Sequence, residues 1–206
     1  MHPNTILRFS GILIFFLGLS MAAPLGVSLF FGDSCTLGLS FALLTTCLLG
    51  GVFFFFTKRR KDEQLNHRDG VAIVTLGWIM AGLVGALPYL FSGAIPDFTN
   101  AYFESVSGFT TTGASIITEI ESLPEGILLW RSLTQWLGGM GIIVLSIAIL
   151  PFLGIGGMQL YKAEIPSPVV DKLKPRISET ARVLWKIYVL ITLLQIILLF
   201  AGGMSF

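Results

Sequence analysis

Long apolar runs dominate this chain and restrict what it can fold into. Five windows of about 20 residues or more are almost free of charge and lack the polar stripe of a helix packed on a soluble core. A helix of about 20 apolar residues can cross the roughly 30 Å of hydrocarbon in a bilayer. We therefore predict an all-α integral membrane protein with spans at Thr5–Phe31, Thr36–Thr57, Val71–Phe91, Ile127–Leu153 and Val183–Gly203.

Composition excludes several classes of function. The chain is 54% hydrophobic and 12% charged, with a net charge of +1. It therefore has no general basic field that would attract nucleic acid, and no such partner is expected. The sequence contains no GxSxG, HExxH or P-loop motif. We therefore expect neither an enzyme nor an organic cofactor.

The basic residues predict an orientation in the membrane. Lys and Arg gather in the loops between the second and third spans and between the fourth and fifth spans, and cytoplasmic loops collect such residues. Both loops and the N-terminus are therefore expected inside the cell. No Lys or Arg occurs from Asp69 to Trp130. The acids of that outer stretch either form a field that attracts cations or merely complement the inner basic loops; they are Asp97, Glu104, Glu119, Glu121 and Glu125.

The segment between the third and fourth spans is too polar to cross a membrane and too apolar for an ordinary loop. Its sequence is "SGAIPDFTNAYFESVSGFTTTGASIITEIESLPEG". Asp97 or Thr99 can cap a short helix, Asn100–Ser107 gives about two turns, and Gly108 is a plausible stop. Since both flanking spans put the ends of the segment outside, we expect a re-entrant hairpin. Irregular backbone at membrane depth must line a watery cavity or be buried in protein.

The tract Thr110–Gly113 has residue types suited to binding a cation. An extended Thr110-Thr111-Thr112-Gly113 can turn successive carbonyls toward an axis, and rings of carbonyls replace the hydration shell of potassium in known filters. Gly113 permits backbone angles closed to other residues. The preceding helix would point its partly negative C-terminal end toward the ion. A TTTG tract alone is a weak signal, and its helix–loop–helix context strengthens it.

Two charged residues near this tract need an explanation. Glu104 is about 10 Å along the helix from Asp97 at 1.5 Å per residue, and a lone charge at such depth requires a partner. We expect Glu104 to brace the loop, by hydrogen bonds or through Arg131, rather than to bind the permeating ion. Arg131 begins the fourth span, where snorkelling to the outer water is the expected behaviour. Trp130 is expected to be an interfacial anchor.

Two passages of the sequence resemble a known family. "FESVSGFTTTGAS" and "LWRSLTQWLGGMGIIVLSIAILPFLGIGGMQLYKAE" are similar to the Trk/Ktr/HKT superfamily of potassium-uptake proteins, in particular its bacterial TrkH-type membrane subunit. In that family four pseudo-repeats, each a helix, a pore loop and a helix, surround one pore, and this branch adds two N-terminal helices. The resemblance implies that 97–108 is a pore helix and that Thr110, Thr111, Thr112 and Gly113 form one quarter of a potassium filter. Their backbone carbonyls would bind the ion, and Thr111 and Thr112 would be its metal-binding residues.

The resemblance also implies an organisation for the whole chain. The pore loop would be supported by Glu104, Gly108 and Arg131. Since the family needs four loops and this chain has one, we interpret it as an N-terminal fragment. The expected parts are two N-terminal helices at 1–57, a basic cytoplasmic loop at 58–70, the first repeat at 71–153, a cytoplasmic loop at 154–182 and the first helix of a truncated second repeat at 183–206.

The implied function is potassium uptake across the bacterial plasma (inner) membrane. Its implied partners are the potassium ion, the lipid bilayer, a second copy of the full-length protein and a cytosolic nucleotide-binding regulatory subunit of the RCK type. Two alternatives remain open at this point: a secondary carrier that binds a solute in a re-entrant hairpin, and a membrane scaffold that transports nothing.

Overall fold

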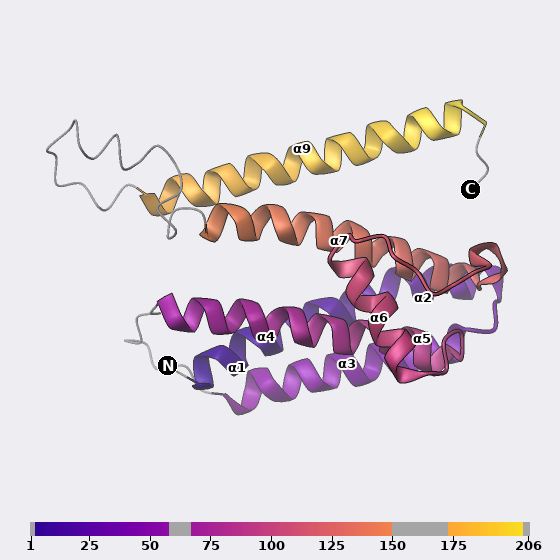
Figure 1. Cartoon of the computed structure of the whole chain (residues 1–206), viewed down its shortest axis with the longest axis horizontal. Coiled ribbons are helices and arrows are strands. Elements are labelled where there is room, and N and C mark those ends of the chain that lie inside the picture. Colours follow the sequence, from indigo (N-terminus) through magenta and orange to yellow (C-terminus); the bar gives the residue numbers. More distant parts are fainter. Residues whose placement is uncertain (1–2, 58–66, 150–172, 204–206) are drawn as a thin grey trace, which may run out of the picture. The chain divides into compact units, whose positions relative to one another are not determined.

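The computed structural model describes residues 3–57, 67–149 and 173–203, and within these ranges all regular secondary structure is helical. The prediction of an all-α chain is therefore confirmed. The elements are α1 (Pro3–Ser20), α2 (Ala22–Phe31), α3 (Thr36–Phe56), α4 (His67–Gly85), α5 (Leu87–Ser92), α6 (Phe98–Phe109), the 3-10 turn η1 (Ile120–Ser122), α7 (Glu125–Ile149) and α9 (Leu173–Ala201) (Figure 1).

The first and third predicted spans each break into two helices near a proline. Pro24 lies in the first turn of α2, which follows the end of α1 at Ser20, and Pro88 lies in the first turn of α5, which follows the end of α4 at Gly85. Proline has no N–H to donate within a helix and clashes with the carbonyl four residues earlier, so the ladder is interrupted ahead of it. Each pair still forms one apolar segment long enough to cross a membrane.

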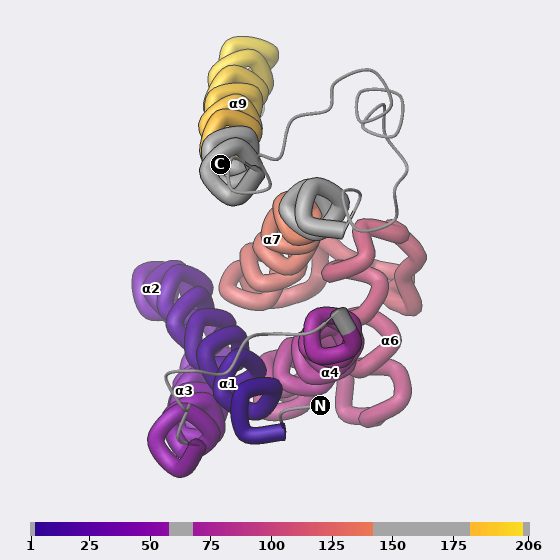
Figure 2. Tube along the Cα trace, turned by 90° about the vertical axis from the view of Figure 1, so that its left-hand side faces the viewer, coloured from indigo at the N-terminus to yellow at the C-terminus, as the bar shows by residue number. Residues whose placement is uncertain are grey.

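The chain divides into two compact units, Met1–Gly138 and Gly139–Phe206. In the first unit α1 packs along α3 and also contacts α4, and α6 packs on α4. Figures 1 and 2 show α1, α3 and α4 side by side, with α6 on the far side of α4 from α3. The core of this unit includes the fully buried side chains of Ile14, Leu39, Tyr89, Ile127 and Trp130. Helix α6 contributes Ala101 and Phe109 to this core.

The second unit contains the end of α7 and the long helix α9. We expected α9 to begin at Val183, after a loop at 154–182, but it begins at Leu173. Pro175 in its first turn suits a helix start, so the helix extends beyond the apolar stretch into polar sequence. The part from 154 to 172 lies outside the described residues.

Four helical segments are long and apolar enough to cross a membrane: Pro3–Phe31, Thr36–Phe56, Arg68–Ser92 and Arg182–Ala201. They correspond to the first, second, third and fifth predicted windows. The fourth window falls on α7, which is not among these segments, and its end at 150–153 lies outside the described residues. The side chains of α7 from residue 142 on lie outside the described residues, so the apolar second half of this helix is not counted among these segments.

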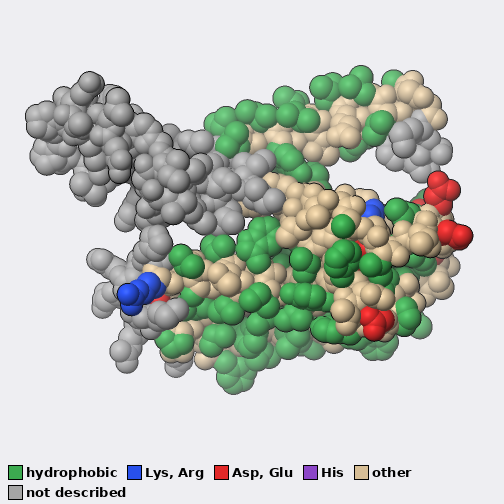
Figure 3. All heavy atoms as spheres, viewed as in Figure 1, with side chains coloured by type: hydrophobic (Ala, Val, Ile, Leu, Met, Phe, Trp, Pro, Cys, Tyr) green, Lys and Arg blue, Asp and Glu red, His purple; other side chains and the backbone are tan. Residues whose placement is uncertain are grey.

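Charge is distributed unevenly along the first unit. On the face shown in Figure 3, acidic side chains gather at one end, where some basic atoms are also visible, and the other basic side chains lie at the opposite end, at the start of α4. The exposed acids of the described sequence after α5 include Asp97, Glu119, Glu121 and Glu125, and an exposed basic residue, Arg68, lies at the start of α4. This polarity agrees with the asymmetry of the sequence.

Candidate functional site

The helix α6 forms where the sequence predicted a short helix between two spans. Asp97, in extended conformation, caps its N-terminus and accepts a hydrogen bond from the Asn100 N–H at 2.9 Å. Such a cap satisfies one of the donors that a helix start leaves free. The helix continues through Phe109, so the expected stop at Gly108 was wrong. Gly108 instead lies against α7, where a Cβ would come within 2.4 Å of the Thr134 hydroxyl.

Helix α6 ends in a left-handed turn at Thr111. Thr110 is still in a right-handed conformation, and Thr111 has a φ of 55°. The Thr111 N–H bonds to the Gly108 carbonyl at 2.9 Å, and the Thr112 N–H bonds to the Ser107 carbonyl at 3.0 Å. These two bonds are those of a Schellman C-cap. The expectation of an extended Thr110–Thr111 was therefore wrong, because both residues are part of the C-terminal cap of the helix.

A threonine at a positive φ is unusual. A left-handed conformation costs a residue with a Cβ about 1–2 kcal/mol, and for a β-branched residue it is a clear outlier. Such strain concentrates at functional sites, where the surrounding structure enforces it. Sequence reasoning expected a special backbone angle at Gly113 only and did not predict one at Thr111, because no local signal in "TTTG" distinguishes the second threonine from its neighbours.

The tract from Thr110 to Gly113 lies exposed at the C-terminal end of α6. Gly113 has a φ of 76°, as expected of a glycine at a special backbone angle. The Thr110 hydroxyl lies 2.8 Å from the Val106 carbonyl and 2.7 Å from the Thr112 hydroxyl. Among the hydrogen bonds between described residues, none ends on the carbonyl oxygens of Thr110, Thr111, Thr112 or Gly113. Four successive carbonyls are thus left available.

The segment that follows the tract returns along α6 and is tied to it. The Ser107 hydroxyl donates to the Ala114 carbonyl. The Glu104 carboxylate accepts from the Ser115 hydroxyl at 3.0 and 3.1 Å and from the Ile116 N–H at 3.2 Å. The tract is therefore anchored on one side by the cap of α6 and on the other by these bonds.

Glu104 is also paired with Arg131 of α7. The Arg131 Nε lies 2.8 Å from a Glu104 carboxylate oxygen, and the two side chains are 18% and 2% exposed. The buried carboxylate thus has the partner that its depth required. The expectation that Arg131 snorkels to outer water was wrong, because the unsatisfied charge of Glu104 turns the guanidinium inward.

Trp130, next to Arg131, also differs from its expected role. Its side chain is fully buried, and its indole N–H donates to the Gly85 carbonyl of α4 at 3.0 Å. Gly85 is the last residue of α4, and its carbonyl accepts this bond from a residue of another helix. The expected interfacial anchor is therefore a link between α7 and α4, and it helps to hold Arg131 beside Glu104.

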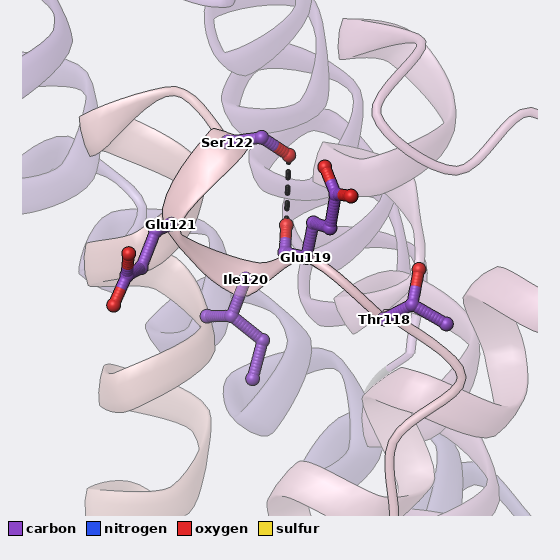
Figure 4. Close-up of a pocket in the computed structure, with 5 residues that line it drawn as sticks. All are labelled: Thr118, Glu119, Ile120, Glu121 and Ser122. Atoms are coloured by element: carbon purple, nitrogen blue, oxygen red, sulfur yellow. Dashed lines mark hydrogen bonds between the residues drawn. The ribbon is translucent and has the colours of Figure 1, made fainter.

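The return segment also contains a shallow hollow at 118–122, shown in Figure 4. The Ser122 hydroxyl donates to the Glu119 carbonyl at 2.7 Å and closes the η1 turn. The Glu119 and Glu121 carboxylates project to different sides of this turn. They therefore do not converge on one point, and the hollow does not include the tract Thr110–Gly113.

The geometry at the end of α6 suits a cation. The C-terminus of a helix carries a partial negative charge, and backbone carbonyl oxygens are the ligands of hard cations such as potassium. The carbonyl oxygens of Thr110–Gly113 accept no hydrogen bond from another described residue and belong to exposed residues, so they can contribute to one side of a ligand shell. The threonine hydroxyls add further oxygen atoms close to the same edge.

Comparisons with known proteins agree with this geometry. The TrkH family model, described as a cation transport protein, matches residues 40–204. The Trk system potassium uptake protein TrkH of Salmonella typhimurium is 45% identical over 99% of this chain and 42% of its own length. The protein of the same name from Halomonas elongata is 46% identical over 100% of this chain and 43% of its own length. The TrkG protein of Escherichia coli is 37% identical over 98% of the chain and 42% of its own length.

A solved structure gives the same result for the fold. The crystal structure of the potassium transporter TrkH from Vibrio parahaemolyticus superposes on this chain with a TM-score of 0.84 and 39% sequence identity. The match covers 100% of this chain and 41% of the chain in the crystal structure. The chain thus spans less than half the length of the relatives that it matches. The resemblance drawn from the two sequence passages is confirmed, and this multi-pass membrane chain belongs to the TrkH family of cation transport proteins.

Proposed function

We propose that this chain supplies one helix–loop–helix repeat of a potassium-uptake protein, and that Thr110–Gly113 forms one quarter of its ion filter. The observation that carries the proposal is the exposed run of four available carbonyls at the C-terminal end of α6. The proposal is supported by the names of the relatives. They are called potassium uptake proteins, and they match 98–100% of this chain. No similarity supports a secondary carrier or a scaffold.

In this proposal potassium is the transported ion, and the chain holds no organic cofactor. The carbonyls of Thr110, Thr111, Thr112 and Gly113 replace part of the hydration shell of the ion. Glu104 acts on the filter indirectly, because its carboxylate is already engaged by Ser115, Ile116 and Arg131. One chain provides only one side of the ligand shell, so further repeats of the same kind complete it.

We further propose the partners and location that the family resemblance implies. These are the bacterial inner membrane, pairing of two copies of the full-length protein, and a cytosolic nucleotide-binding regulatory subunit of the RCK type. We propose that the regulatory subunit binds the inner segment 154–182. Residues 154–172 of this segment lie outside the described residues, and residues 173–182 form the first part of α9. Binding of a purified regulatory subunit to a peptide of this segment tests the assignment.

The filter proposal predicts that these 206 residues alone conduct no potassium-selective flux. A single set of carbonyls cannot surround an ion. We further propose that this chain is part of a longer protein that also contains the remaining repeats, and we refer to that protein below as the parent protein. In liposomes the parent protein should carry rubidium in preference to sodium, whereas the 206-residue chain should give the background of empty liposomes. A selective flux from the short chain would instead indicate assembly of four copies.

The orientation proposal predicts which loops can be labelled from outside. In intact cells, a cysteine introduced at Glu121 should react with a membrane-impermeant maleimide, because the charge asymmetry places the return segment outside. A cysteine at Lys61 should react only after the cells are opened. The parent protein with its natural Cys35 and Cys47 gives the background. Reaction of both introduced cysteines from outside would overturn the assignment.

A further inference from the structure

The turn between α2 and α3 contains a carboxylate that is bonded on both of its oxygens. Asp33 Oδ1 accepts from the Ser28 hydroxyl, from the Cys35 N–H at 3.3 Å and from the Cys35 thiol at 2.9 Å. Its Oδ2 accepts from the Gly126 N–H at 3.0 Å. Gly126 lies 93 residues away, in the first turn of α7. Asp33 thus joins the N-terminal helices to the helix that follows the filter.

The start of α7 is fitted closely into this turn. Gly126 is buried, and a Cβ at its position would come within 2.8 Å of atoms of Leu39 and Ser28 and 3.0 Å of the Cys35 sulfur. Ile127, next in sequence, is also fully buried. The first N–H groups of a helix have no partner within the helix, so a carboxylate from elsewhere in the chain can cap them. Asp33 acts as such a remote cap.

A continuous set of contacts leads from this cap to the filter tract. Five residues beyond Gly126, on the same helix, Arg131 pairs with Glu104. Glu104 in turn holds Ser115 and Ile116, directly after the tract. Five residues of helix span about 8 Å. The position of the first turn of α7 therefore determines where the Arg131 guanidinium meets Glu104.

We propose that Asp33 is a positioning residue for the filter: by holding Gly126, it makes the two N-terminal helices part of the scaffold that sets the return segment after Thr110–Gly113. This inference rests on the proposed function of that tract. It gives a role to the N-terminal helices, which contribute no residue to the tract itself.

The chemistry of the contact requires a carboxylate. Burial alone would raise the pKa of Asp33, but hydrogen bonds from Cys35, Ser28 and Gly126 outweigh it and lower the pKa below its ordinary value. Burial and the neighbouring Asp33 raise the pKa of the Cys35 thiol to about 11, so the thiol keeps its proton and can donate it. An amide side chain at this position has one acceptor atom in place of two. The substitution Asp33→Asn would therefore remove either the bond to Gly126 or the bonds to Ser28 and Cys35.

The test is Asp33→Asn in the parent protein, with Glu121→Gln as the matched control. Glu121 is an exposed carboxylate of the outer stretch. Its variant also removes one negative charge, but it leaves intact the series of contacts that leads from Asp33 through Gly126, Arg131 and Glu104 to the filter tract. We expect Asp33→Asn to lower the ratio of rubidium to sodium flux at least about threefold, and Glu121→Gln to leave the ratio at the parent value. Gly126→Ala, which crowds the same contact, should have the same effect as Asp33→Asn, and the double variant should be no worse than either single variant.

A second measurement separates positioning from loss of folding. Hydrogen exchange of the purified variants should be faster in peptides covering 125–131 and 114–117 and unchanged in α3 and α4. Uniformly faster exchange would reduce Asp33 to an ordinary contribution to stability and would overturn the inference. So would a parent-like flux ratio in Asp33→Asn. If Gly113→Asp alters the ratio while Asp33→Asn does not, the filter assignment stands and this inference fails.

Discussion

Gly113→Asp in the parent protein is expected to reduce rubidium uptake per molecule about tenfold, or to admit sodium at the expense of rubidium. Gly113 has a φ of 76°, and a residue with a Cβ pays about 1–2 kcal/mol in this region. Since about 1.4 kcal/mol corresponds to a factor of ten, strain of this size lowers the ratio of the native filter conformation to a relaxed alternative about tenfold. A new carboxylate next to four carbonyls also changes the field at the ion.

Two further variants separate these causes. Gly113→Ala adds the Cβ without the charge, and the space around the Cβ position is open within the described chain, so its loss of uptake should come from backbone strain alone. Thr111→Ser keeps the hydroxyl and the carbonyl and removes the β-branch from a residue at a φ of 55°, so uptake should stay near the parent value. The measurement is rubidium and sodium flux per molecule in a host that lacks potassium uptake. An unchanged rate and flux ratio in Gly113→Asp would falsify the filter assignment.

Local patterns in the sequence predicted much of the fold. Apolar length alone located the four segments that can cross a membrane. The sequence offered two capping residues for α6, Asp97 and Thr99, and the structure uses Asp97, because an N-cap is recognisable from its side chain and its neighbours. The special backbone angle at Gly113 followed in the same way from the residue type.

Features that depend on long-range contacts were missed. Nothing near Trp130 in sequence shows that its indole reaches the Gly85 carbonyl, 45 residues away. The inward turn of Arg131 depends on Glu104, 27 residues earlier, and the role of Asp33 depends on Gly126, 93 residues later. The sequence did indicate that a buried Glu104 needs a partner and that Arg131 could be that partner, but it did not show that the guanidinium turns away from the outer water. The strained Thr111 belongs to the same class, since the bonds at the end of α6 enforce its conformation.

Glu104→Gln in the parent protein is expected to destabilise the first unit by about 3 kcal/mol. Removing one partner of a buried ion pair costs roughly 3–5 kcal/mol because the remaining charge is left uncompensated. Arg131 keeps some access to solvent, at 18% exposure, which places the expected cost at the lower end of that range. The glutamine can still accept from the Ile116 N–H but has no charge to offer the guanidinium. The return segment should therefore loosen together with the start of α7.

The pair can be tested by a double-mutant cycle, measured as thermal unfolding of the detergent-solubilised protein. Arg131→Met keeps most of the volume of the side chain and leaves Glu104 buried with its hydrogen bonds to Ser115 and Ile116 but no cation. Each single variant should therefore unfold at a lower temperature than the parent. The double variant Glu104→Gln/Arg131→Met has no uncompensated charge. Its unfolding temperature should therefore fall by less than the sum of the decreases in the two single variants, because replacing a buried ion pair by uncharged side chains often changes stability little. Strictly additive losses would show that Glu104 and Arg131 act independently, and the filter would then be braced by the hydrogen bonds to Ser115 and Ile116 alone.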